Sequence, residues 1–78
     1  MLEGKDEKEY RKRFARRLRA LREITGYNQT EFARELQIGR VSLNRYELGV
    51  QIPSVNSLWF ICRVLGISID DFLEGVLK

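Results

Sequence analysis

The sequence predicts an all-α fold, a compact domain of five helices. Apolar residues recur three and four positions apart, without the strict alternation that is typical of β-strands. Glycines and capping residues divide the chain into segments of helical length. The 78 residues, 44% of them hydrophobic, suffice for one small core. We therefore treat residues 1–8 as a flexible N-terminal segment and residues 9–78 as a single domain.

The first helix is expected to end near Thr25, because Gly26 can supply the left-handed residue that closes a helix. Its apolar stripe has spacings of four, four and three and consists of Tyr10, Phe14, Leu18 and Leu21. Residues 10–22 also contain seven basic side chains and no acidic ones. Such a run suggests a polyanionic partner, although a solvated helix face would carry the same charge.

Two short helices follow, separated by a tight break. Asn28 and Glu31 form a capping-box pattern at the start of a helix over residues 29–36. The next helix is expected over residues 40–48, and Gly49 terminates it. The residues of these two helices that we expect to be buried are Phe32, Ala33, Leu36, Leu43 and Tyr46.

The third helix presents a chemically specific outward face. At about 100° per residue, Leu43 and Tyr46 lie on one side of this helix. An α-helix fits the major groove of B-DNA, where arginine can read guanine, asparagine can read adenine and an apolar group can contact the thymine methyl. The residues that we expect to read bases, from the first turn and the outward side, are Arg40, Val41, Asn44 and Arg45. Of the two arginines, one is expected to read a base and the other to neutralise a phosphate, and the sequence does not distinguish them.

Pro53 and Ser54 mark the start of a fourth helix over residues 55–65, which Gly66 ends. This helix is apolar around almost its whole circumference, which a surface helix does not require. We expect a homodimer interface built from its outer residues and the C-terminus, namely Trp59, Phe60, Val64, Val76 and Leu77. Scattered exposed apolar residues are the alternative explanation.

The fifth helix begins after Ser68, and Asp70 and Asp71 lie in its first turn. Acids at that position complement the helix dipole, so this pair indicates capping rather than acid–base catalysis. The chain has no histidine, no glycine-rich phosphate loop and no cluster of metal ligands. We therefore expect no enzymatic activity, no cofactor, no metal and no small-molecule ligand. The single cysteine, Cys62, fits a cytoplasmic location, and no apolar run approaches the roughly 20 residues that span a bilayer.

The stretch from Phe14 to Leu73 resembles the phage Cro and repressor type of helix-turn-helix proteins, also called the XRE-like family. The resemblance rests on Gln29, Ala33, Ile38, Leu43, Tyr46, Glu47, Gly49 and Pro53 in this order. It implies a lambda-repressor-like domain over residues 9–78 that regulates transcription by inserting the helix over residues 40–48 into the major groove of a specific DNA sequence. Gln37 stands where the family usually has glycine, so either it adopts the left-handed conformation at some cost or the turn differs slightly from that of the family.

The resemblance also implies roles for residues around this helix. Gln29 would contact a DNA phosphate and brace the recognition helix, with Asn28 also near the backbone. Glu47 would pair with Arg22, since a carboxylate at the C-terminal end of a short helix opposes the helix dipole unless a cation compensates it. The further candidates for phosphate contacts are Arg19 and the backbone amides at and after Gly49. The other basic residues of the first helix would supply only a long-range attractive field.

A symmetric dimer of this kind would require a near-palindromic operator, and repression is the regulatory mode that we expect. Two other functions remain open. The first is an antitoxin-type regulator that also binds a toxin protein through the fourth or fifth helix, and the second is a protein-interaction adaptor of the same fold. We do not expect binding to a membrane surface, because the apolar stripe of the first helix is needed for the core.

Overall fold

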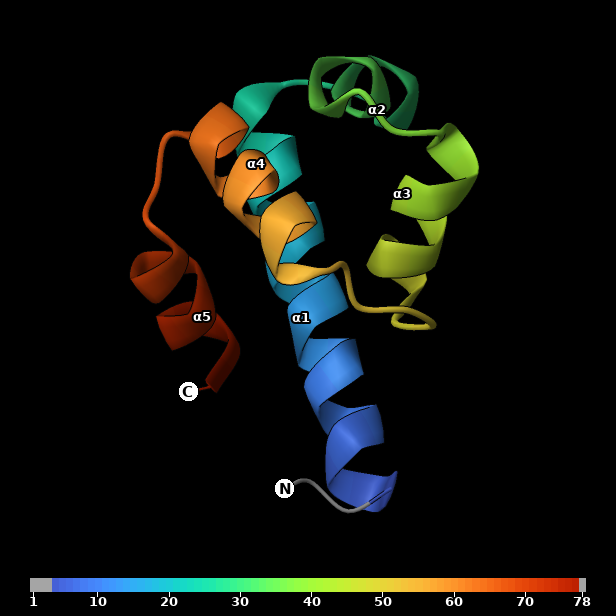
Figure 1. Cartoon of the computed structure of the whole chain (residues 1–78), viewed down its shortest axis with the longest axis vertical. Coiled ribbons are helices and arrows are strands. Elements are labelled where there is room, and N and C mark those ends of the chain that lie inside the picture. The colour runs from blue at the N-terminus through green and yellow to red at the C-terminus, as the bar shows by residue number, and fades with distance from the viewer. Residues whose placement is uncertain (1–3, 78) are drawn as a thin grey trace.

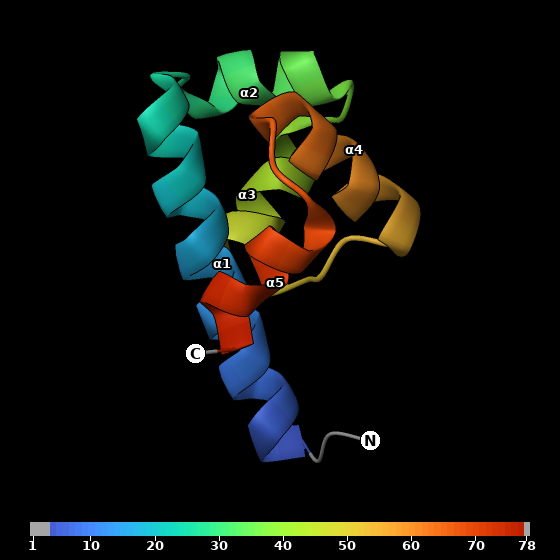
Figure 2. The same ribbon diagram turned by 90° about the vertical axis from the view of Figure 1, so that its left-hand side faces the viewer.

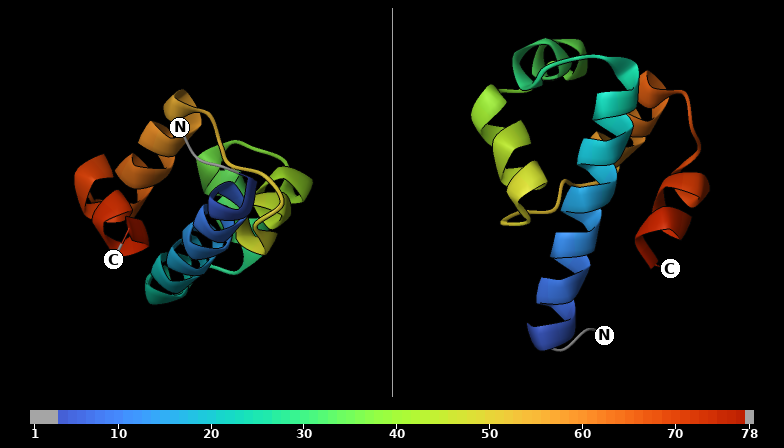
Figure 3. Two further views of the ribbon diagram at one scale, coloured as in Figure 1. Left: turned by 90° about the horizontal axis from the view of Figure 1, so that it is seen from below. Right: turned by 180° about the vertical axis from the view of Figure 1, so that it is seen from behind.

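The computed structural model describes residues 4–77, and every regular element in that range is a helix (Figure 1). The five helices are α1 (Gly4–Thr25), α2 (Gln29–Leu36), α3 (Arg40–Leu48), α4 (Val55–Leu65) and α5 (Ile69–Leu77). Helix α1 is the long central element, and α2 crosses near its C-terminal end (Figure 2). Seen from below, α4 and α5 lie on one side of α1 and α3 lies on the other (Figure 3). The predicted fold class is confirmed, and no helix in residues 4–77 is both long and apolar enough to cross a membrane.

Helix α1 begins earlier than the sequence analysis suggested. It starts at Gly4, so residues 4–8 of the segment expected to be flexible are helical, while residues 1–3 lie outside the described range. Ion pairs between Glu7 and Arg11 (3.3 Å) and between Glu9 and Arg13 (3.4 Å) join successive turns. Each such pair adds a few tenths of a kcal/mol to a helix. The N-terminal turns of α1 project beyond the other helices (Figure 1).

The core lies where the other helices meet α1. Phe14 and Phe72 are fully buried, and their ring centroids are 5.0 Å apart, which joins α1 to α5. All five residues of α2 and α3 that were expected to be buried are buried. Val76 is also buried, with 1% of its surface exposed, although it was assigned to a dimer interface. That assignment is wrong, because Val76 lies one helical turn after Phe72 and shares its inward face.

Arg17 attaches α5 to α1. Its guanidinium donates to the main-chain oxygens of Asp71 (3.0 Å) and Phe72 (3.3 Å). Gly75 permits this approach, because a Cβ at that position would overlap the Arg17 side chain. From the sequence we expected Arg17 to have only a long-range electrostatic role, whereas in the structure it makes a specific contact.

The helix ends follow the capping residues that the sequence marks. The Asn28 side chain accepts from the Glu31 amide (2.8 Å), and the Glu31 side chain accepts from the Asn28 amide (2.9 Å). Ser54 caps α4, and Ser68 accepts from the amide of Asp71 at the start of α5. The predicted capping motif at the start of α5 is therefore confirmed.

Candidate nucleic-acid interface

The turn between α2 and α3 is compact and closed by main-chain hydrogen bonds. Gln37 has φ 57° and ψ 39°, so it adopts the left-handed conformation. Its amide donates to the Arg34 oxygen (3.1 Å), and the Ile38 amide donates to the Ala33 oxygen (3.0 Å). Gly39 then precedes α3 in an extended conformation and offers no side chain to cap it. The turn therefore contains one residue in an unfavourable backbone conformation and one weak cap.

Helix α3 is buried on one side and exposed on the other. Leu43, Tyr46 and Glu47 are 0%, 7% and 2% exposed. The opposite side carries all four residues expected to read bases, and all four are exposed. A shallow surface hollow of about 570 Å³ extends over this side and is lined by Gln29, Arg40, Val41, Asn44, Arg45, Leu48 and Val50. The exposed face of α3 is therefore continuous with the N-terminus of α2.

A buried ion pair anchors α3 to α1. The Arg22 guanidinium donates to both carboxylate oxygens of Glu47, with Nε–Oε2 at 2.7 Å and Nη2–Oε1 at 3.0 Å, and its Nη1 donates to the Tyr27 oxygen at 2.9 Å. The hydrogen bond to Glu47 raises the pKa of Arg22 above its ordinary value. The expected pair of Arg22 and Glu47 is therefore present, and it is bidentate.

Gln29 extends this pair to the exposed face. Its Nε2 donates to Glu47 Oε1 (3.0 Å) and to Asn44 Oδ1 (3.2 Å). Four side chains thus form a polar network that runs from α1 to the outer face of α3: Arg22, Glu47, Gln29 and Asn44. The hydrogen bond from Gln29 therefore favours one orientation of the exposed Asn44 carboxamide in the free protein.

The role expected of Gly49 needs a correction. The Gly49 amide donates back to the Arg45 and Tyr46 oxygens, and the Val50 amide donates to the Arg45 oxygen (3.1 Å). Both amides therefore cap α3 and are not available to a phosphate. The Gly49 oxygen accepts from Arg11 Nε (3.3 Å), and a Cβ on Gly49 would lie 3.2 Å from the Arg11 oxygen. Gly49 is thus the point where the end of α3 contacts α1.

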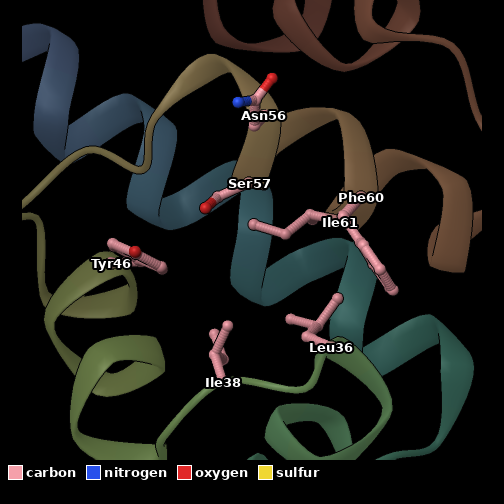
Figure 4. Close-up of a pocket in the computed structure, with 7 residues that line it drawn as sticks. All are labelled: Leu36, Ile38, Tyr46, Asn56, Ser57, Phe60 and Ile61. Carbon is pink, nitrogen blue, oxygen red and sulfur yellow. The ribbon is translucent and has the colours of Figure 1, made fainter.

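The structure also distributes the expected dimer residues over different surfaces. Trp59 is 52% exposed, lies under the Arg63 guanidinium (5.3 Å to the ring centroid) and borders the loop before α5. Phe60 is half-buried and lies on a different surface from Trp59. It lines a cavity of about 220 Å³ together with residues of α2 and α3 (Figure 4). Val64 is half-buried, and Leu77 is 66% exposed beside the N-terminal half of α1. Trp59 is therefore the member of the set that presents a large apolar surface on α4.

The chain resembles known regulators of transcription. Residues 18–72 match the family described as "Helix-turn-helix". The chain is 36% identical over 62 residues to the SPbeta prophage-derived uncharacterized HTH-type transcriptional regulator YonR of Bacillus subtilis (strain 168), which covers 80% of this chain and 57% of that protein. It is 38% identical over 58 residues to the uncharacterized HTH-type transcriptional regulator YazB of the same organism, covering 74% of this chain and 84% of that protein. This chain thus spans little more than half of the first relative.

Solved structures show the same arrangement of helices. The clp gene regulator ClgR from Corynebacterium glutamicum has a TM-score of 0.81 and 26% identity, over 87% of this chain and 72% of that chain. An HTH_3 family transcriptional regulator from Vibrio cholerae shares the fold, with a TM-score of 0.78 and 24% identity, over 87% of this chain and 38% of that chain. These proteins are described as regulators, which agrees with the regulatory function predicted from the sequence.

Proposed function

The chain belongs to the helix-turn-helix family of transcriptional regulators, and from this premise we propose that it binds a specific DNA sequence by inserting α3 into the major groove. One observation carries the proposal. The outer face of α3 is open to solvent, and the hydrogen bond from Gln29 favours one orientation of the Asn44 side chain on that face. A side chain that is oriented in the free protein loses less conformational freedom when it binds.

The residues of α3 can divide the reading of bases among them. The Asn44 carboxamide can pair with the N6 and N7 positions of adenine, since its oxygen retains a second lone pair beside the bond from Gln29. Arg40 lies in the first turn of α3, the part of a recognition helix that points into the groove. Val41, which is 69% exposed, can contact a thymine methyl, and Arg45 supplies a second guanidinium.

The N-terminus of α2 is suited to a DNA phosphate, because it offers main-chain amides and a favourable potential. Both side-chain N–H groups of Gln29 donate within the protein, so Gln29 would contact the phosphate through its main-chain amide. The Nδ2 group of Asn28 can contribute beside it, since the capping box uses only the amide and the oxygen of that residue. Arg19 is exposed on α1 and can neutralise a further phosphate.

Binding as a homodimer completes the proposal. Two copies joined across Trp59 on α4 would place their α3 helices about one turn of DNA apart, roughly 34 Å, so the operator would be nearly palindromic. A dimer bound at a promoter in the cytoplasm would act as a repressor by blocking it. In sedimentation, Trp59→Glu should give monomers, whereas Ile24→Glu, a change at an apolar residue that is 81% exposed on α1, should leave the dimer intact.

The decisive experiment is a selection from random duplex DNA, which should recover one inverted repeat. On that sequence, Asn44→Ala should weaken binding by about 1–3 kcal/mol per contact and relax the preference at one position of each half-site. Asn56→Ala removes an exposed asparagine from α4 and is the matched control, with no expected effect. Recovery of no preferred sequence would contradict the proposal.

An adaptor would bind a protein partner and tolerate changes at Arg40 and Asn44, and an antitoxin would bind both DNA and protein.

A further inference from the structure

The basic residues of α1 fall into two groups. Four arginines contact other parts of the protein: Arg11 bonds to Gly49 and Glu7, Arg13 to Glu9, Arg17 to α5 and Arg22 to Glu47. Four others, Lys8, Lys12, Arg16 and Arg19, are exposed and make no hydrogen bond or ion pair with the described residues 4–77. The run of positive charge therefore contains a subset that is not neutralised within the protein.

Three of these four cations lie on one face of α1. At about 100° per residue, Lys8, Lys12 and Arg19 fall within about 40° of one another, and they span about 16 Å along the helix. Arg16 lies further round and lines the groove between α1 and α5, so it does not belong to this row. Glu23, one turn after Arg19, carries a negative charge, so the run of positive charge on this face ends at Arg19. We call Lys8, Lys12 and Arg19 the basic row.

The basic row borders the face of α3 that is proposed to bind DNA. The residues of α1 that face α3 include Arg11 and Arg22, and the row lies about 70° round the helix from them, on the side away from α5. A Cβ on Gly49 would lie 3.4 Å from the Cα of Lys12, so α3 ends beside the middle residue of the row. Val50, the next residue, lines the hollow over α3. The two surfaces are therefore continuous.

We infer that the basic row is a second contact surface for DNA, which binds backbone phosphates outside the stretch of groove occupied by α3. This inference rests on the proposed function and extends its footprint. Duplex DNA carries one charge per roughly 3.4 Å of axis on each strand, so a row about 16 Å long can follow several phosphates. The N-terminal turns of α1 project beyond the other helices (Figure 1), whereas Lys12 lies beside Gly49 at the end of α3. Phosphate contacts add affinity without adding sequence preference.

The salt dependence of DNA binding tests this inference. Each phosphate contact contributes about 0.9 to the slope of log K against log salt concentration. The triple variant Lys8→Gln, Lys12→Gln, Arg19→Gln should therefore reduce the slope by about 2.7 and keep the sequence preference of the wild type. When the salt concentration rises from 50 to 200 mM, each phosphate contact contributes a factor of about 3.5 to the loss of affinity, and a variant that lacks the contact does not lose that factor.

Arg13→Gln is the matched control, because it removes the same charge from the residue next to Lys12 but on the face where Arg13 pairs with Glu9. Glutamine is a good helix former, so circular dichroism should show α1 intact in all variants. On a duplex trimmed to the selected site, the slopes of the triple variant and the wild type should differ by at most the Arg19 contact, about 0.9, while a duplex with flanks should separate them by about 2.7. A slope for the triple variant equal to that of Arg13→Gln on the flanked duplex would overturn the inference and leave the proposed function standing. Absence of any DNA binding by the wild type would overturn both.

Discussion

The α2–α3 pair and the α4–α5 pair both pack on α1, but within residues 4–77 only the first of them carries a buried ion pair. Both sides bury apolar side chains, such as Phe32 on the first side and Phe72 on the second. Hydrogen bonds from Arg17 to main-chain oxygens of α5 add to the apolar contacts of the second side. On the first side, Glu47 is buried and binds the Arg22 guanidinium through both carboxylate oxygens. Apolar contacts are non-directional, whereas a bidentate ion pair has a defined geometry. The comparison indicates that apolar burial stabilises both sides and that the polar network sets the orientation of the face that would meet DNA.

The largest expected effect comes from removing apolar packing on the α4–α5 side. Phe72→Ala should lower the free energy of unfolding by about 3–5 kcal/mol, because it leaves a cavity against the fully buried ring of Phe14. Urea denaturation followed by circular dichroism measures this loss. Leu77→Ala, at a residue of the same helix that is 66% exposed, should change stability by no more than about 0.5 kcal/mol. Equal losses in the two variants would contradict the assignment of the core.

The next effect comes from breaking the ion pair on the α2–α3 side. Arg22→Ala should cost about 3 kcal/mol of stability, because it leaves the Glu47 carboxylate buried without its cation. Replacing both partners, as Arg22→Met with Glu47→Leu, should recover most of that stability, since apolar residues often replace a buried pair without loss. Gln29 would then lack its bond to Glu47, so we expect sequence-specific DNA binding to stay impaired. A double variant with normal DNA binding would show that packing alone orients α3.

Sequence reasoning located the elements well because caps and left-handed residues are local signals. Asn28, Ser54 and Gly66 mark helix ends through contacts with residues only a few positions away. The contacts it missed join distant parts of the chain, such as Arg11 with Gly49, which are 38 residues apart. A long arginine can reach many partners, and the crossing of two helices decides which one it meets. The same limit explains Val76, whose inward position depends on how α5 packs on α1.

A smaller effect is expected at the turn between α2 and α3. Gln37 is the non-glycine residue of positive φ in the described range, a conformation that costs a side chain about 1 kcal/mol. Gln37→Gly should therefore raise the free energy of unfolding by about 0.5–1 kcal/mol in urea denaturation. Gln51→Gly, in the loop after α3, is the matched control and should bring no gain, because Gln51 does not have a positive φ. A loss of stability in Gln37→Gly would mean that the Gln37 side chain has a stabilising contact.

The smallest effect is a pH dependence on the α4–α5 side. Burial raises the pKa of the Cys62 thiol above its ordinary value, so the folded protein keeps this proton at a pH where the unfolded chain loses it. Stability from this group is present below the ordinary pKa of about 9.0 and declines as the pH rises above it. The difference in unfolding free energy between wild type and Cys62→Ala should therefore shrink from pH 8 to pH 10. A constant difference over that range would contradict the prediction.

The glycine inside α5 has a consequence for how the chain assembles. A nine-residue helix with a glycine at its seventh position is too short to persist alone, so α5 depends on the burial of Phe72 and on the guanidinium of Arg17, beside which Gly75 lies. A ribosome releases α1 before α5. The surface of α1 on which α5 packs has therefore already been synthesised when α5 emerges, and α5 can fold as it docks on that surface.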